Sequence, residues 1–537
     1  MKIIISFCAV FCLLFPFSVA ISQDHLPTDF LDKDFHKGRR DAVRKLMPPN
    51  SIAVFFANPI RNRSNDVDYV YHQDPDFYYL TGYREPNAVM LLFSDIQHYD
   101  DGDPFNEMIF VQPRDPQSEM WNGRRLGVEG VKTKLGLDRV YENSQFASVN
   151  IDYSSFDKIM FIELKKDVKD NPRDDSDLFS LIYEFKKAVD FPVDFDSEKF
   201  RLYDLIRTVD ESNGANVAQV VGRDLNYLSE YKNDDILNAF VNAGNIKDKI
   251  KVARKIPENK LDGYSLAYMM NSLREVKSPE ELVLLRKAIN ISAIGQREVM
   301  KAMQEGMSEL EIQGIHEFVF KKYGAEYEGY PSIVGAGNNG CVLHYIDNSK
   351  TKVEDELVLM DLGAEYHGYS ADVTRTIPVN GKFNKEQRAI YELVYKAQEA
   401  GFEACKPGAS FRAPHEAARA VINQGLKELG IISDVEVEHN YFPHGTSHYL
   451  GLDVHDRGNY GDLKEGTVIT VEPGIYIPEG SPCDKKWWGI AVRIEDDILI
   501  TKEGFENLSK LAPRAPEEIE NLMKTESPLQ NFKLPEL

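Results

Sequence analysis

Short apolar runs bounded by turn residues recur along the first half of the chain and predict β-strands. These runs lie at 52–56, 88–93, 108–111 and 158–162, and a stretch with helical periodicity follows at 177–188. Strands mixed with helices in this way predict an α/β domain over residues 24–230. The pattern then becomes helical, and we interpret residues 231–275 as a helical linker.

A second part begins with a strong helix-start signal. Ser278 is followed by Pro279, and Glu281 comes three positions after the serine, which is the pattern of a capping box with proline in the first turn. We assign residues 276–510 to a second domain. The segment 511–537 is rich in proline and charge and is predicted to be a peripheral tail. The predicted fold class is α/β (α+β), with two main domains.

Two strand-like runs within residues 357–379 flank a short polar turn. A turn centred between Tyr366 and His367 would make Asp361 and Asp372 direct cross-strand partners, with Cβ atoms about 4.5–5.5 Å apart. The positions that alternate with them are apolar, so the opposite face of this hairpin is predicted to be core.

Two ionised carboxylates that face each other repel, so this pair leaves three alternatives open. One aspartate keeps a proton, or a cation lies between the two. The third alternative is that the turn centre is off by one residue and the pair is split. The hairpin alone does not decide between them.

Composition narrows the class of protein. The 537 residues are 42% hydrophobic and 28% charged, which is typical of a globular protein, and the formal net charge is −23. This charge argues against nucleic acid or an anionic membrane surface as a partner. Beyond the first twenty residues, three scattered cysteines are too few for a disulfide framework or a cysteine zinc site.

The first twenty residues read as a secretory signal peptide. Lys2 gives a positive start, an apolar run follows, and small residues precede a cleavage point after Ala20. We therefore expect an exported protein, periplasmic or secreted. An uncleaved anchor is the alternative; no later stretch is long and apolar enough to span a bilayer, so no stable membrane anchor is expected after cleavage.

The run Gly335–Gly340 fits the G-x-G-x-x-G pattern of dinucleotide sites. Such a site needs the glycines to open a helix after a strand. Here the strand-like run 341–345 follows, so we interpret the glycines as a turn between two strands. No G-x-S-x-G elbow or complete H-E-x-x-H motif is present, so the sequence does not support a serine hydrolase or a zincin-type zinc protease.

Further candidate ligands follow in the second domain. Three histidines, His444, His448 and His455, fall within twelve positions beside glycines, which favours a functional cluster over satisfied core residues. Glu472 ends an apolar strand just before Pro-Gly, and strand alternation puts Arg493 and Glu495 on one face. The plainer alternatives are an exposed edge charge and a salt-bridged strand surface.

Two aspartates, one histidine and two glutamates together form a plausible metal site: Asp361, Asp372, His448, Glu472 and Glu495. Hard oxygen ligands with one imidazole suit Mn²⁺, Co²⁺ or Zn²⁺. Five such residues exceed what one ion usually needs, so we predict two metal ions that neutralise the facing aspartates.

The spacing of these five residues closely resembles the pita-bread metallopeptidases. The run HGTSHYLGLDVHD at 444–456 resembles the signature of the proline-specific branch, which includes aminopeptidase P and prolidase. The runs DFYYLTG at 76–82 and FVQPRD at 110–115 resemble the N-terminal domain of that branch. The resemblance implies an N-terminal aminopeptidase-P-type domain followed by a pita-bread catalytic domain.

The resemblance also implies roles for individual residues. Asp361 and Asp372 would bind one metal, Asp372, His448 and Glu495 the other, and Glu472 would bridge them and act as general base. His344 would contact the substrate and polarise the carbonyl, and His455 would hold the proline side. Arg493 would lie near the substrate, His444 would support the site, and Tyr330 would line it.

Within the branch, the resemblance favours an Xaa-Pro aminopeptidase that releases the first residue from peptides with proline in second position, by attack of a hydroxide bridging two metal ions. Mn²⁺ is the expected metal, with Zn²⁺ or Co²⁺ as alternatives, and the expected partners are proline-containing peptides and further copies of the chain in a dimer or tetramer. A prolidase that cleaves Xaa-Pro dipeptides is the alternative activity. A catalytically inactive binding module is the alternative class, which the five intact ligand positions argue against.

Overall fold

The computed structural model describes residues 27–98, 102–149 and 151–531. The account below concerns the described residues from 31 onward. The predicted signal peptide, residues 1–20, lies outside the described residues. In the described part of the chain, every helix is too short or too polar to cross a membrane.

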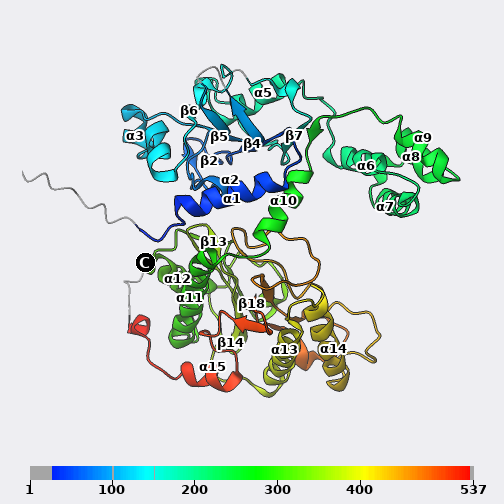
Figure 1. The fold of residues 1–537 in the computed structure, drawn as a ribbon. Helices are drawn as coiled ribbons and strands as arrows, with labels where there is room; N and C mark the ends of the chain where they lie inside the picture. Colours follow the sequence, from blue (N-terminus) through cyan, green and yellow to red (C-terminus); the bar gives the residue numbers. More distant parts are fainter. Residues whose placement is uncertain (1–26, 99–101, 150, 532–537) are drawn as a thin grey trace, which may run out of the picture. The chain divides into compact units, whose positions relative to one another are not determined.

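The N-terminal part is built on a six-stranded mixed sheet (Figure 1). Its strand order is β6-β5-β4-β1-β7-β8, and the central pair β1 and β4 is antiparallel. The bounds are β1 (Ser51–Phe56), β4 (Val89–His98), β5 (Pro104–Val111), β6 (Val140–Glu142), β7 (Lys158–Phe161) and β8 (Leu261–Asp262). The four strands predicted in this region are confirmed.

Both faces of this sheet are buried at its centre, which explains why β1, the first half of β4 and the second half of β5 are continuously apolar instead of alternating. Ala53 and Phe55 of β1 pack into the same core as α1 (Lys33–Leu46) and α2 (Pro75–Thr81). Their neighbours Ile52 and Val54 point to the opposite face and join the core of α5 (Leu178–Ala188). Helix α5 covers the predicted helical run, with Asp177 as its N-cap.

Four further helices form a small cluster with its own hydrophobic core. They are α6 (Ser197–Arg207), α7 (Gly214–Tyr227), α8 (Asp235–Asn242) and α9 (Ile246–Ala253). The segment 231–275, predicted as a helical linker, holds α8, α9 and α10 (Ser265–Arg274), but it also holds β8. Because β8 pairs with β7, the N-terminal sheet takes its last strand from beyond residue 230.

The second part places two long helix pairs around short antiparallel sheets (Figure 1). The helices are α11 (Pro279–Ala302), α12 (Glu309–Lys322), α13 (Lys385–Ala404) and α14 (Ala413–Glu428). The predicted capping box at Ser278 is confirmed: its side chain accepts a hydrogen bond from the Glu281 backbone, and the Glu281 side chain bonds back to the Ser278 backbone. Helix α11 packs against the hairpin that carries the two aspartates, and α13 packs against the strand that carries Arg493.

The strands of this part form three small sheets and one hairpin. They are β9 (Tyr327–Glu328), β10 (Ile333–Ala336), β11 (Leu357–Asp361), β12 (Ala364–Tyr366), β13 (Tyr369–Ser370), β14 (Thr374–Pro378), β15 (Val468–Val471), β16 (Gly474–Ile477), β17 (Ile490–Arg493), β18 (Asp496–Ile500) and β19 (Phe505–Asn507). The α/β (α+β) class with two main parts is confirmed.

Two sequence predictions need correction. The glycine-rich run forms a short 3₁₀ turn, Gly337–Cys341, but no strand follows it, because the next residues to 350 form an irregular loop. The segment after 511 is not wholly peripheral: Ala512 and Ile519 are buried, and the buried Arg375 guanidinium donates hydrogen bonds to the carbonyl oxygens of Ala512 and Pro513. This contact and α15 (Pro516–Leu522) attach the tail to the core.

Candidate metal centre and active site

The hairpin with the two aspartates turns one residue later than predicted. Tyr366 pairs with Tyr369, so the turn is centred between His367 and Gly368. Both turn residues have positive φ, 52° and 89°, as a two-residue type I′ turn requires. The register prediction was therefore wrong: Asp361 pairs with Thr374, not with Asp372.

The two aspartates nevertheless meet. Moving the turn centre by one residue shifts the pairing by two positions, and a shift of two keeps every side chain on its face. The Tyr330 hydroxyl lies 2.5 Å from a carboxylate oxygen of Asp361 and 2.5 Å from one of Asp372. The opposite face of the hairpin is apolar and fully buried, as predicted.

All ten residues singled out from the sequence line one cavity of about 620 Å³. They are Tyr330, His344, Asp361, Asp372, His444, His448, His455, Glu472, Arg493 and Glu495. The rest of the wall is mainly apolar and comes from Pro331, Ile333, Leu343, Ile346 and Val454. Strand ends and loops from 330 to 495 converge here, so the fold brings the candidate chemistry to a single place.

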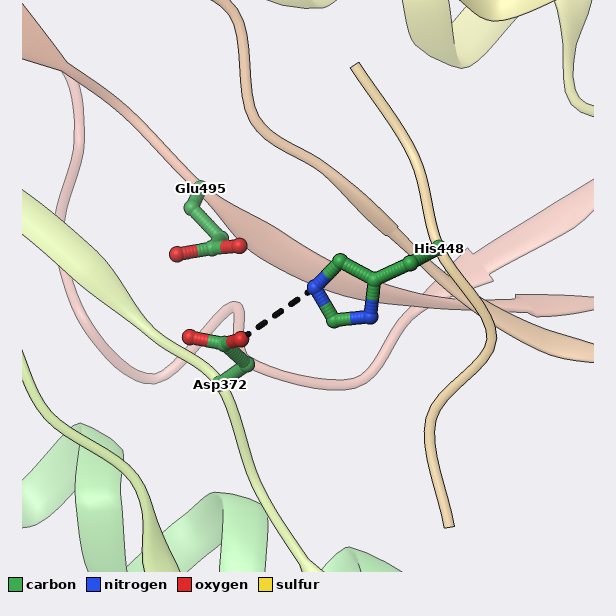
Figure 2. A group of neighbouring side chains, drawn as sticks. All are labelled: Asp372, His448 and Glu495. Atoms are coloured by element: carbon green, nitrogen blue, oxygen red, sulfur yellow. Dashed lines mark ion pairs between the residues drawn. The ribbon is translucent and has the colours of Figure 1, made fainter. Parts of the chain in front are cut away.

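Asp372, His448 and Glu495 form the tightest group (Figure 2). One potential ligand atom from each lies within 4.8 Å of the others, and His448 Nε2 is 3.3 Å from Asp372 Oδ2. His448 Nδ1 lies 2.9 Å from the Tyr449 carbonyl oxygen, which can only accept, so Nδ1 carries the hydrogen. The Nε2 lone pair therefore points at the carboxylates, as a metal-binding imidazole requires.

Asp361 and Glu472 line the same cavity beside this group. Glu472 Oε1 lies 3.6 Å from His448 Nε2. Asp361 Oδ2 accepts a hydrogen bond from Arg493 at 2.5 Å. The five predicted ligands thus face one another across the cavity, and their oxygen-rich donor set with one imidazole fits divalent cations.

The cluster carries more negative than positive charge. Burial, reinforced by the charges of Asp361 and Asp497, raises the pKa of Asp372 well above its usual range. Burial and the neighbouring carboxylates likewise raise the pKa of Glu495. Burial also raises the pKa of Asp361, but the Arg493 charge and the Tyr330 hydrogen bond outweigh it and lower that pKa overall. One guanidinium compensates only part of four carboxylates, and a metal ion would supply the rest.

The three other histidines take different positions. His344 is exposed on the loop after the 3₁₀ turn. The His455 ring lies 4.2 Å from that of His448, centroid to centroid, and its pKa is lowered to about 4 by burial and then by the charges of His448 and His344. His444 Nε2 accepts a hydrogen bond from the Tyr476 hydroxyl at 2.8 Å, and its Nδ1 lies 3.6 Å from Glu472 Oε2.

Arg493 was predicted to lie near the substrate and Tyr330 to line the site, and both line the cavity. Their polar groups, however, bond to the protein. Arg493 is 4% exposed and donates to Asp361, to the Tyr476 hydroxyl at 2.9 Å and to the Thr374 hydroxyl at 3.2 Å. In this arrangement Arg493 neutralises Asp361, and the uncharged Tyr330 hydroxyl holds both aspartates by hydrogen bonding.

Sequence reasoning missed the residues that hold the ligands. The Thr374 hydroxyl donates to Glu495 Oε2 at 2.6 Å, and the Asp372 backbone N–H donates to Asp497 Oδ2 at 3.2 Å. Asp497 could have been noticed as a buried carboxylate in an apolar strand, two positions after Glu495. Thr374 gives no such signal, because threonine is ordinary in a strand.

Comparisons with known proteins agree with this geometry. Residues 283–502 match metallopeptidase family M24, and residues 36–158 match the N-terminal domain of aminopeptidase P. The Xaa-Pro aminopeptidase of Escherichia coli (strain K12) is 35% identical over 499 residues, which cover 90% of this chain and 96% of that protein.

Solved structures agree on the fold. Pseudomonas aeruginosa aminopeptidase PepP superposes with a TM-score of 0.69 at 32% identity, over 92% of this chain and 98% of that one. Aminopeptidase P from E. coli, solved with the inhibitor Pro-Leu, gives a TM-score of 0.69 at 31% identity with the same coverage. The predicted aminopeptidase-P-type domain followed by a pita-bread domain is confirmed, and the chain belongs to metallopeptidase family M24, within its aminopeptidase P group.

Proposed function

We propose that this metalloaminopeptidase releases the N-terminal residue from peptides that have proline in the second position. The observation that carries the proposal is the convergence of Asp361, Asp372, His448, Glu472 and Glu495 on one cavity, together with the family membership. The chain retains all the ligand-type residues, so the inactive binding module has no support in the site.

We further propose that the site holds two divalent ions, Mn²⁺ first among the candidates. Four carboxylates and the Arg493 guanidinium give a formal charge of about −3, which two divalent ions and one hydroxide would balance. Asp372 faces both Asp361 and His448, which supports its role as a shared ligand. When bound, the ions would activate a water nucleophile and polarise the peptide carbonyl.

Glu472 is the best-placed residue to accept and pass on a proton. Its side chain is 17% exposed, more than those of Asp361 and Asp372, at 10% and 8%. It lies between His448 and His444, so it faces the cavity where the substrate would enter. In the proposed reaction, Glu472 takes a proton from the attacking water and delivers it to the proline nitrogen that leaves.

His344 and His455 would contact the peptide. The lowered pKa of His455, about 4, keeps its ring neutral near pH 7, so one ring nitrogen can donate to a carbonyl oxygen and the other can accept. His344 is exposed at the cavity wall and is free of steric cover from the core. We assign carbonyl polarisation to His344 and the proline side to His455.

A test compares an Xaa-Pro dipeptide with an Xaa-Pro-Xaa tripeptide, using protein stripped of metal by a chelator and then reloaded with Mn²⁺. We expect metal-dependent release of the first residue from the tripeptide. Cleavage of the dipeptide alone would identify the alternative, a prolidase. The bound metal is counted in parallel by elemental analysis, and one ion per active chain would contradict the two-metal proposal.

Export and assembly complete the proposal. The composition of the first twenty residues supports a cleaved signal peptide and a periplasmic or secreted protein. N-terminal sequencing of the protein isolated from its host should begin after Ala20; retention of Met1 would contradict export by cleavage. We also propose a dimer or tetramer, which light scattering on the purified chain would test against a monomer.

A further inference from the structure

The loop that carries His344 has little regular structure to hold it. After the 3₁₀ turn Gly337–Cys341 it runs without helix or strand to residue 350. Leu343, His344 and Ile346 from this loop all line the cavity. A side chain at the tip of such a loop needs an anchor elsewhere if it is to meet a substrate in one geometry.

Glu309 provides an anchor. It is the first residue of α12, is 0% exposed, and lies outside the wall of the cavity. Its Oε1 accepts hydrogen bonds from the Ala336 backbone N–H at 2.8 Å and the Asn339 side chain at 3.1 Å. Its Oε2 accepts from the Tyr345 hydroxyl at 3.0 Å and the Lys350 backbone N–H at 2.8 Å.

These four donors span the loop from its start to its end. Ala336 and Asn339 precede His344, Tyr345 is its immediate neighbour, and Lys350 closes the loop. A carboxylate is an acceptor-only group with room for about four hydrogen bonds. Glu309 therefore has its accepting capacity filled by this loop alone, and all four donors are neutral.

Asn348 fixes the same loop from inside the fold. It is 1% exposed and has a positive φ of 44°. Its side chain accepts from the Val334 backbone N–H at 2.9 Å and donates to the Ser332 carbonyl oxygen at 2.9 Å. The second half of the loop is thus tied to the strand β10 as well as to α12, which leaves His344 little freedom of its own.

We propose that Glu309 is a positioning residue of the active site: by binding both ends of the loop 336–350, it holds His344 against the cavity. This inference rests on the proposed peptidase function. Glu309 acts through His344 and not through the metal ligands, because the four hydrogen bonds that its carboxylate accepts all come from this loop.

The decisive variant is Glu309→Gln, which keeps size and shape. A glutamine amide turns one acceptor oxygen into a donor, so two of the four donors would face an N–H group. We expect kcat/KM on the tripeptide to fall by on the order of 10²-fold, as for a misplaced catalytic contact. Glu311→Gln is the matched control, because Glu311 lies in the same helical turn but bonds only within its capping box; we expect less than about a threefold change.

The double variant with His344→Ala separates positioning from general damage. If Glu309 acts through His344, then Glu309→Gln should cost almost nothing in the His344→Ala background. Metal content should stay at the wild-type level, and hydrogen exchange should rise at the amides of 336–350 while the other strands keep their protection. An equal loss in both backgrounds, or a loss of bound metal, would overturn the proposal.

Tyr345→Phe keeps the test decisive if Glu309→Gln does not fold. It removes one donor to Glu309, together with the oxygen that accepts from Asn339 and from the Ser349 backbone N–H within the same loop. A smaller loss that again disappears with His344→Ala is expected. Unchanged activity of Tyr345→Phe would then count against the inference. An inactive wild-type protein would refute the proposed function instead, whereas additive losses in an active protein refute only the role of Glu309.

Discussion

Four of the five metal-ligand candidates are oriented by a hydrogen bond to a second residue. Tyr449 fixes the tautomer of His448 through its carbonyl oxygen, Thr374 bonds Glu495, and Tyr330 bonds both aspartates. Groups of this kind usually matter for metal affinity and activity nearly as much as the ligands themselves. At the residue scale, the geometry of the site therefore depends on these partner residues, and we expect their substitution to disturb metal binding.

Tyr330→Phe tests this pairing. The variant keeps the ring and removes the hydroxyl that lies between Asp361 and Asp372, so the two carboxylates lose a shared donor. We expect activity or metal affinity to fall by about 10- to 100-fold. Calorimetric metal titration and kcat/KM measure this. A variant that binds metal and turns over like wild type would show that the hydroxyl does not organise the aspartates.

At the scale of elements, the hairpin β11–β14 depends on close backbone approach. A Cβ on Gly363 would lie 1.7 Å from the Ala371 carbonyl oxygen, and no side-chain rotation can relieve an overlap with backbone. Gly363 stands between Asp361 and the turn, so the glycine permits the crossing that brings the aspartates together.

We therefore expect Gly363→Ala to destabilise the fold by about 3 kcal/mol or more and to abolish activity. Gly461→Ala is the control, because a Cβ there meets nothing within 4 Å. Thermal unfolding of both variants decides the matter. A Gly363→Ala protein with a wild-type Tm would mean that the strands can separate at little cost.

At the scale of the whole molecule, a buried ionic network connects the N-terminal part to the catalytic part. Arg274 is 1% exposed; its guanidinium donates to Asp76 of α2 at 2.7 Å and to Asp456, which follows the site histidine His455. Lys277 donates to the other oxygen of Asp456 at 2.8 Å. The network couples the position of the 453–456 loop to helix α2 of the N-terminal part.

Arg274→Ala leaves two buried carboxylates without their main partner. We expect a loss of about 3–5 kcal/mol in the free energy of unfolding. Arg457→Ala is the matched control: this arginine also pairs with Asp76, at 3.0 Å, but its side chain is 30% exposed, and its loss should cost under about 1 kcal/mol. If the two variants lose the same free energy of unfolding in denaturant titrations, burial does not make the Arg274 ion pairs more important than that of Arg457.

The pH dependence of stability has a source in α12. His316 is fully buried, neither ring nitrogen has a hydrogen-bond partner in the described structure, and burial lowers its pKa from 6.5 to about 3. As the pH falls below 6.5, His316 is protonated in the unfolded chain but stays neutral in the folded protein. The free energy of unfolding is therefore unaffected by this residue above pH 6.5 and decreases progressively from pH 6.5 to pH 3.

His316→Leu should flatten this dependence. Wild-type protein should lose about 2 kcal/mol from this residue between pH 7 and pH 5, and the variant should not. Both proteins are measured without metal in denaturant titrations, so that protonation of the metal ligands cancels in the comparison. Identical slopes for the two proteins would show that His316 finds a partner on protonation.

Much of the site could be predicted from sequence because its signals are local. The five metal-ligand candidates and the three other histidines stand in short runs whose residue types and spacing are visible in the chain, and the structure gathers all of them at one cavity. The aspartate pair was found despite a wrong register, because strand side chains have a period of two and an error of two positions leaves the face unchanged. Strands such as 52–56 and the helix start at Ser278 could also be predicted from local sequence.

What the sequence alone could not decide depends on contacts between distant segments. Only the tertiary structure showed that Arg493 is committed to Asp361, that the run 341–345 is a loop held by Glu309, and that β8 joins a sheet begun two hundred residues earlier. The tail is attached because the buried Arg375 guanidinium donates to its carbonyl oxygens. This contact could not be predicted from the sequence of residues 511–523. Periodicity and helix capping depend on neighbouring residues, so they can be predicted from the sequence. The hydrogen bonding of buried polar groups depends on which distant segments pack together, so only the folded structure determines these contacts.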